Sequence, residues 1–301
     1  MPDTGSTVPR RQVGRLMRQL REQAGISLMA AAEELEFSRA RMYRIENGEV
    51  PVRKHDVIAM CGVYRAGPEM TEVLIALAQE SKAKGWWHAY GDVVPDWFEL
   101  YVGMEQAASR LRAYAPSVVP GLVQCREYAE YVFESWFGKD ATRVHNAVAV
   151  RLERQSLLTR RLPEAPQVEV VIDEGALRRG IPDRLGMRKQ LAHLVNVSTR
   201  PNVRVRVIPF AAGPHRAAGS GQFTILDFPA VAAASPEPTT VYCEYLTGAL
   251  YLDKVAEVNA YESIWADLAD TALSQSESDE LIHTILQEDD QDDDDGFVSS
   301  P

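Results

Sequence analysis

The chain has 301 residues, of which 46% are hydrophobic and 25% are charged, and its formal net charge is -11. This composition is ordinary for a globular protein, and the length allows two domains with separate cores. No run of about 18 apolar residues occurs and the N-terminus lacks the apolar core of a signal peptide, so we expect a cytoplasmic protein without a membrane segment.

The charge is distributed unevenly along the chain. Residues 1–66 carry more Lys and Arg than Asp and Glu, although the chain as a whole is acidic. The last fifteen residues carry seven carboxylates and no basic side chain. We therefore expect a mildly basic N-terminal domain over residues 1–84 and a disordered acidic tail over residues 288–301.

Five short helices are predicted in the N-terminal domain. Apolar residues recur every three or four positions between Arg11 and Ala24, which is typical of an amphipathic helix. Ser27 is placed to cap a second helix, and Ser38 to cap a third that runs to Asn47. A loop and a fourth helix follow, and a fifth helix begins at Pro68. The pattern indicates an all-α bundle.

The second and third helices, joined by a turn of three to four residues, form a helix-turn-helix pattern. On the third helix, Met42 and Ile45 are expected to face the core, which leaves its arginines outward. An arginine fork matches the O6/N7 edge of guanine, and one such contact is worth about 1–3 kcal/mol of discrimination. We predict base reading by Arg39, Ala40, Arg41 and Arg44, and DNA backbone contacts by Ser27, Ser38, Tyr43, Asn47, Arg53 and Lys54. The alternative is that these arginines form an ordinary solvated face.

The stretch 16–50 resembles the lambda-repressor-like, or XRE-family, helix-turn-helix. The resemblance implies an ion pair between Arg21 and Glu46 that fixes packing, and base-reading positions at the start of the third helix and one turn later. Two residues depart from the family pattern. Glu36 stands where a turn glycine is usual, which raises the cost of a positive φ there. Leu28 replaces the polar residue that often opens the second helix.

An α+β domain is predicted over residues 85–287. Its first half reads as helical, and β-rich runs with turn residues between them follow. The predicted strands are residues 167–173, 202–210, 222–228 and 240–246. The predicted helices are residues 97–115, 125–137, 143–162, 184–198, 253–273 and 276–287.

This second domain resembles the C-terminal domain of many actinobacterial helix-turn-helix regulators, some of which are labelled antitoxin-like. The resemblance rests on the aromatic opening at residues 85–101, on the "VPGL-Q" run and on the strands that follow. It implies a regulatory role and leaves the ligand or partner open.

The sequence offers little for enzymatic chemistry. Nucleophile-elbow, metalloprotease and phosphate-loop motifs are absent from it, and Cys61, Cys125 and Cys243 are too far apart for a CxxC site. Asp173 is expected to cap a helix and His215 to lie in a glycine-rich loop. We therefore expect no enzyme activity, no metal and no other cofactor.

One aromatic group is a candidate effector site. Trp86, Trp87, Trp97 and Tyr101, together with Phe98, could line an apolar pocket. Packing between domains or between two copies explains the same residues equally well.

Taken together, these features predict a sequence-specific DNA-binding transcriptional regulator whose recognition helix, residues 38–47, enters the major groove of double-stranded DNA. A homodimer suits paired half-sites, and the C-terminal domain would receive a small-molecule or protein signal. The alternative is an antitoxin-like interaction protein that sequesters a small partner protein and regulates its own promoter.

Overall fold

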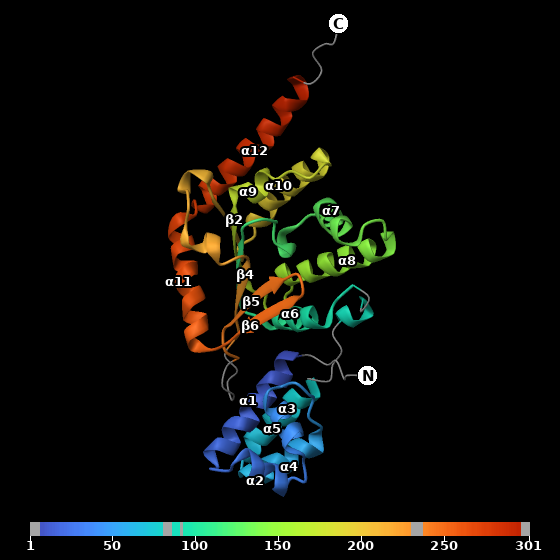
Figure 1. Cartoon of the computed structure of the whole chain (residues 1–301), viewed down its shortest axis with the longest axis vertical. Helices are drawn as coiled ribbons and strands as arrows, with labels where there is room; N and C mark the ends of the chain where they lie inside the picture. Colours follow the sequence, from blue (N-terminus) through green and yellow to red (C-terminus); the bar gives the residue numbers. More distant parts are fainter. Residues whose placement is uncertain (1–6, 81–85, 91–92, 230–236, 296–301) are drawn as a thin grey trace. The chain divides into compact units, whose positions relative to one another are not determined.

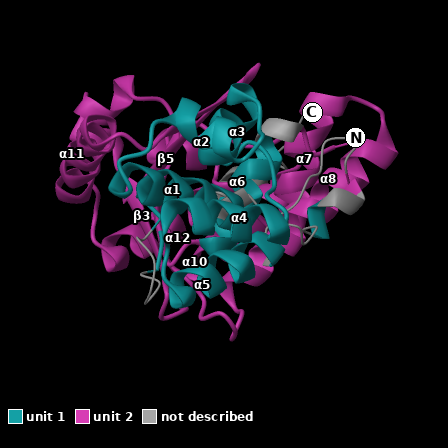
Figure 2. Cartoon of the chain, turned by 90° about the horizontal axis from the view of Figure 1, so that it is seen from below, with its two compact units in different colours: residues 1–89, 96–107, 228–238 teal, residues 90–95, 108–227, 239–301 magenta. Residues whose placement is uncertain are grey.

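A computed structural model of the chain describes residues 7–80, 86–90, 93–229 and 237–295. Its contacts define two compact units (Figure 2). The first unit comprises residues 1–89, 96–107 and 228–238, and the second comprises residues 90–95, 108–227 and 239–301. The first unit thus takes in two segments beyond the predicted boundary at residue 84.

The first unit is a bundle of short helices, as the apolar spacing predicts (Figure 1). Its helices are α1 (Thr7–Gln23), α2 (Leu28–Glu34), α3 (Arg39–Glu46), α4 (Lys54–Tyr64), α5 (Pro68–Glu80) and α6 (Asp96–Ala107), and the short 3₁₀ helix η1 (Trp86–Tyr90) precedes α6.

The core of this unit is built from apolar stripes on the helices α1 to α5. Met17 of α1, Met42 of α3, Met60 of α4 and Leu74 of α5 are fully buried. Each lies at helical spacing from other buried residues of its own helix, such as Val13 beside Met17. Burial of these stripes holds helices that are too short to be stable alone.

Two glycines allow α1 to lie directly against the end of α3. A Cβ atom at Gly14 would come within 2.5 Å of the carbonyl oxygen of Ile45. A Cβ atom at Gly48, whose φ is +69°, would come within 2.7 Å of the Cα atom of Arg11. Only glycine fits at either place without moving a backbone.

The two added segments of the first unit pack on α1. Arg11 donates from Nη1 to the sulfur of Met104 on α6 at 3.4 Å. The buried carboxylate of Glu237 forms ion pairs with Arg11 and Arg15. These contacts explain why the structural boundary differs from the one expected at residue 84.

The second unit is built on a six-stranded mixed sheet in the order β3-β2-β1-β4-β5-β6. β1 pairs parallel with β2, and β2 with β3, while β4, β5 and β6 add antiparallel pairs. The strands are β1 (Arg110–Ala115), β2 (Gln167–Asp173), β3 (Val203–Ile208), β4 (Phe223–Asp227), β5 (Thr240–Tyr245) and β6 (Gly248–Leu252).

Helices cover both faces of this sheet. Figure 1 shows α11 on one side and α7, α8 and α10 on the other. Trp265 and Leu268 of α11 pack on strand residues such as Val171, Ile225 and Val241. The helices are α7 (Arg126–Phe137), α8 (Ala141–Arg154), α9 (Glu174–Arg178), α10 (Arg184–Ser198), α11 (Val255–Thr271) and α12 (Gln275–Asp295). No helix in the described part of the chain is long and apolar enough to cross a bilayer.

The structure corrects the sequence-based assignment at two strands. The helix predicted over residues 97–115 ends at Ala107, and residues 110–115 form β1 in the interior of the sheet. Pairing with both β2 and β4 decides the conformation of a segment whose helical spacing continues that of α6. β6 was not predicted, because its five residues follow β5 after a two-residue turn and read as loop.

The acidic end of the chain also differs from the prediction. Residues 288–301 were expected to be disordered, yet α12 continues to Asp295. Ile282 and Ile285 are buried, and Glu288 forms an ion pair with Arg178 of α9. These contacts anchor the helix that residues 289–295 extend, and residues 296–301 lie outside the described part.

We predict that Gly14→Ala lowers the free energy of unfolding by about 1–3 kcal/mol, because the added methyl group must push α1 away from α3. Gly62→Ala is the matched control. Gly62 is exposed on α4 and nothing lies within 4 Å of an added Cβ, so alanine should stabilise by about 0.5–1 kcal/mol. Denaturant unfolding followed by circular dichroism measures both. Equal effects of the two substitutions would contradict the close approach.

Candidate nucleic-acid interface

Both helices of the helix-turn-helix begin at a serine cap. The hydroxyl oxygen of Ser27 accepts a hydrogen bond from the backbone N–H of Ala30, and that of Ser38 accepts one from Arg41, each at 3.1 Å. Each hydroxyl keeps its own hydrogen, which can be donated to a phosphate. Ser27 and Ser38, which are both predicted to contact the DNA backbone, are therefore exposed at the starts of α2 and α3.

The turn between α2 and α3 is strained at the predicted place. Glu36 has φ 55°, a left-handed conformation that favours glycine. The backbone N–H of Phe37 donates to Ala32 at 2.8 Å, which closes the turn onto α2. The turn thus fixes the angle at which α3 leaves α2, in spite of the missing glycine.

α3 has one buried and one exposed face. Met42, Ile45 and Glu46 are buried, whereas Arg39, Ala40, Tyr43 and Arg44 are exposed. Arg39 lies one turn before Tyr43, and Ala40 one turn before Arg44, so the four form a continuous surface. This surface includes three of the four positions predicted to read bases.

Arg41, the fourth position, has a side chain that is bound by other residues of the same unit. Its Nη2 donates to the buried carboxylate of Asp56 on α4 at 2.7 Å, and its guanidinium lies 3.8 Å from the centre of the Phe37 ring. The side chain is still 41% exposed. Asp56 therefore competes with any base for Arg41, which distinguishes it from Arg39 and Arg44.

Arg44 is constrained much less. Its Nε makes one long hydrogen bond, 3.4 Å, to the carbonyl of Ala40 one turn earlier. Its guanidinium remains exposed beyond that contact. An arginine of this kind can turn its fork towards a base edge without breaking a buried interaction.

Arg21 and Glu46 meet in a bidentate ion pair, as the family resemblance implies. Nε and Nη2 of Arg21 donate to the two carboxylate oxygens at 2.6 and 2.8 Å. Nη1 donates to the carbonyl of Ile26, so the same guanidinium also holds the loop before α2. Hydrogen bonding to Glu46 raises the pKa of Arg21, and the arginine stays charged although it is buried.

The remaining candidates for backbone contacts lie around α3 on exposed positions. Tyr43 is 58% exposed, and Arg53 and Lys54 are exposed at the start of α4. Asn47 donates weakly, at 3.4 Å, to Glu49.

The aromatic residues that were expected to line an effector pocket pack against each other in pairs, as far as the structure describes them. Trp86 and Trp87 meet edge to face at 5.9 Å, and Phe98 stacks on Tyr101 at 5.4 Å. Trp87 and Tyr101 are buried. The side chain of Trp97 lies outside the described part of the structure.

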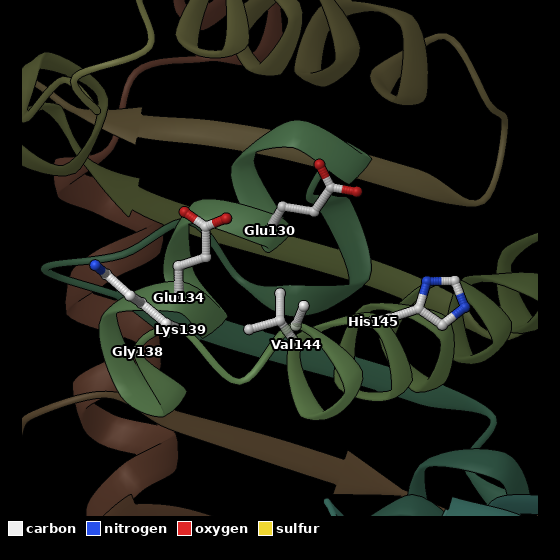
Figure 3. Close-up of a pocket in the computed structure, with 7 residues that line it drawn as sticks. Glu130, Glu134, Gly138, Lys139, Val144 and His145 are labelled. Carbon is white, nitrogen blue, oxygen red and sulfur yellow. The ribbon is translucent and has the colours of Figure 1, made fainter.

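A shallow hollow of about 240 Å³ lies elsewhere, in the second unit, at the corner between α7 and α8 (Figure 3). It is smaller than most ligand pockets, and charged and uncharged residues line it together. Among its lining residues are Glu130, Glu134, Lys139 and His145. None of Trp86, Trp87 and Tyr101 lines this hollow.

The other residues considered for chemistry have structural roles. The carboxylate of Asp173 accepts from the backbone N–H of Gly175 at 2.8 Å and caps α9, as expected. His215 packs edge-on against Tyr114. Burial raises the pKa of all three cysteine thiols. The described residues contain no cluster of three His, Cys, Asp or Glu that could hold a metal ion.

Sequence reasoning did not identify Asp56 or Phe37 as the residues that hold Arg41. Fifteen residues separate Arg41 from Asp56, and they come together only because α4 packs beside α3. No spacing rule links residues on different helices, so only the folded bundle reveals this contact.

We predict that Glu46→Ala destabilises the protein by about 3–5 kcal/mol, because Arg21 is left as a buried charge without its partner. Glu22→Ala is the matched control. Its pair with Arg18 is more than half exposed on both sides, and the expected change is below about 1 kcal/mol. Replacing the buried pair by Arg21→Met with Glu46→Leu should restore most of the loss. Denaturant unfolding measures all three, and a double variant no better than Glu46→Ala would contradict the buried-charge account.

Comparison with known families fits these observations. A helix-turn-helix domain model matches residues 12–74, which include α2 and α3, and a domain of unknown function, DUF5753, matches residues 98–284. No curated protein and no solved structure is similar enough to this chain to match it. A helix-turn-helix bundle with two capped helices thus precedes a matched region that spans more than half of the chain, and the chain belongs to the DUF5753 family.

Proposed function

We propose that this protein is a sequence-specific DNA-binding transcriptional regulator of the XRE type, and that α3 enters the major groove. The observation that carries the proposal is the exposed pair Arg39 and Arg44 on a serine-capped helix whose opposite face is buried. A helix fits the major groove, and exposed arginine forks match guanine there.

Support for backbone positioning comes from the residues around α3. Arg53 and Lys54 are exposed at the start of α4, and Ser27 and Ser38 carry hydroxyl hydrogens at helix starts. Basic side chains and hydroxyls are the groups that usually bind phosphates and fix the register of a recognition helix. The proposal assigns these residues to affinity and the arginines of α3 to sequence choice.

The fixed position of Arg41 refines the assignment. Since Asp56 and Phe37 hold its guanidinium, the side chain of Arg41 is already oriented before DNA binds and is less free to rotate towards a base. Arg39 and Arg44 are then the residues on which discrimination depends most. Ala40, between them, would contact a thymine methyl group.

The second unit is assigned signal reception and dimerisation, in a cytoplasmic binding protein without enzyme activity of its own. Its sheet and helices give it an independent core, which suits a module that responds to a small molecule or a protein. The antitoxin-like alternative rests on family resemblance alone.

We predict that Arg44→Ala and Arg39→Ala each lose about 1–3 kcal/mol of discrimination between the preferred site and a site altered at the contacted base. Selection of bound sequences from random duplexes first defines the preferred site, and binding titrations then compare the variants. Arg18→Ala, an exposed arginine on α1, is the control and should leave discrimination unchanged. If both α3 variants select the wild-type sequence with wild-type ratios, base reading by α3 is wrong.

We predict a different effect for Lys54→Ala, which should weaken binding to all sequences alike. Loss of one phosphate contact reduces the slope of log affinity against log salt by about 1. Titrations at several salt concentrations measure the slope. A sequence-dependent loss in this variant would contradict its assignment to the DNA backbone.

A further inference from the structure

The two edge strands of the sheet in the second unit differ in the contacts that they make with other residues. The strand order places β3 at one edge and β6 at the other. An edge strand offers backbone N–H and C=O groups to any further strand, so natural proteins usually cover or charge it. The contacts at each edge therefore indicate whether the sheet is closed or can be extended.

The β3 edge is closed by the junction of α11 and α12. The backbone N–H of Val207 donates to the hydroxyl of Ser278 at 3.0 Å, and its carbonyl accepts from the backbone N–H of Leu273 at 2.9 Å. Arg206 adds hydrogen bonds to carbonyls at the end of α11, including that of Ala269. A further strand could pair there only by displacing these contacts.

Charge, proline and a bulge, which often protect an edge strand, are missing from β6. The run from Tyr245 to Leu252 contains no charged residue and no proline. The register from Tyr245↔Gly248 to Val241↔Leu252 is continuous, so no bulge twists the edge away. No strand of the described sheet lies beyond β6.

Apolar side chains are exposed along the same hairpin. Leu250, at the centre of β6, is 47% exposed, and Tyr245 and Leu246 at the turn are 53% and 86% exposed. Leu250 lies opposite Cys243, so its side chain is on the face of the sheet that α11 covers. The apolar layer under α11 thus continues to an edge where Leu250 remains half exposed.

We propose that β6 pairs antiparallel with β6 of a second copy of this chain, about a twofold axis at Leu250, to form a continuous twelve-stranded sheet. A twofold axis at this strand sets Leu250 opposite Leu250 and Gly248 opposite Leu252, in matching registers on both copies. The interface is the uncharged strand β6, residues 248–252.

The absence of charge along β6 makes this edge suitable for pairing with itself, because a twofold axis sets each residue of the strand opposite one from the same strand of the other copy. Two chains with a formal net charge of -11 each repel one another, and like charges facing across strands are destabilising. The uncharged run lets two copies meet with no charged side chain opposite another along the paired strands. Because the β3 edge is closed, β6 cannot add to β3 of another copy, and the assembly ends at a dimer instead of a filament.

The purpose of this dimer rests on the proposed function, because two recognition helices would read two half-sites of one operator. The pairing itself is independent of DNA. Experiments on the free protein therefore test the pairing separately from DNA reading.

The first test is the oligomeric state of the full chain by sedimentation. The wild-type chain should be a dimer, and Leu250→Arg should raise the dimer dissociation constant on the order of 30-fold, because it puts two like charges at the centre of the interface. Leu246→Arg, in the exposed turn, is the matched control and should leave the constant unchanged. Circular dichroism verifies that each variant is folded.

The second test is cross-linking of Leu250→Cys under mild oxidation. Directly opposite residues of antiparallel strands have Cα atoms about 4.5–5.5 Å apart, within the range of a disulfide. Leu246→Cys should not cross-link, since residues 246 of the two copies would be on the order of 25 Å apart. Both variants carry Cys243→Ala, because Cys243 lies opposite Leu250 and would otherwise pair with the new thiol within one chain. The other two native cysteines, Cys61 and Cys125, are buried, so the background is low.

The results separate this inference from the proposed function. A wild-type chain that stays monomeric, or a dimer that Leu250→Arg leaves intact and Leu250→Cys does not link, overturns the pairing. Neither result affects base reading, which Arg44→Ala tests on a single half-site. A chain that links through position 250 but selects no DNA sequence keeps the pairing and loses the proposed function.

Discussion

The buried ion pair between Arg21 and Glu46 is the constraint on which the candidate DNA-reading surface depends. It joins α1 to the last turn of α3 through two hydrogen bonds, and a third from the same guanidinium holds the loop before α2. Gly14 lets the two helices approach until only a hydrogen atom fits between α1 and the carbonyl of Ile45. A polar clamp and a steric contact therefore define one position of α3 relative to α1. Base recognition needs such a position, because a fork displaced by about 1 Å no longer matches both acceptors of guanine.

The arginines of this unit illustrate how environment, and not residue type, assigns a role. Arg21 is buried and bidentate, so it serves packing. Arg41 forms an ion pair with Asp56, and its side chain remains partly exposed to solvent. Arg44 has a single weak bond to its own helix, and Arg39 is exposed. The sequence does not distinguish Arg39, Arg41 and Arg44. The spacing of basic residues on one helix does not show which residues of other helices pack beside them. The structure separates them, and discrimination is accordingly assigned first to Arg39 and Arg44.

Much of the first unit follows from its sequence, and less of the second. Helix caps are local, so Ser27 and Ser38 mark the helix starts correctly, and the strain at Glu36 follows from the missing glycine. β1 escaped prediction because its helical spacing continues that of α6, and only pairing with distant strands makes it extended. The continuation of α12 into the acidic end depends on contacts such as that of Glu288 with Arg178, more than a hundred residues apart. Non-local pairings of this kind decide structure without leaving a local pattern.

The boundary between the two matched domains does not coincide with the boundary between the two structural units. The DUF5753 match begins at residue 98, yet α6 and Glu237 belong to the first unit, where Met104 and Glu237 contact Arg11 and Arg15 of α1. Residues of the matched region thus complete the bundle that carries α3. The same helix α1 holds Arg21, so Glu237 and Glu46 both form buried ion pairs with arginines of α1. Contacts therefore lead from Glu237 to Arg15, along α1 to Arg21, and across to Glu46 of α3, so the position of α3 depends on α1 and on residues of the matched region together.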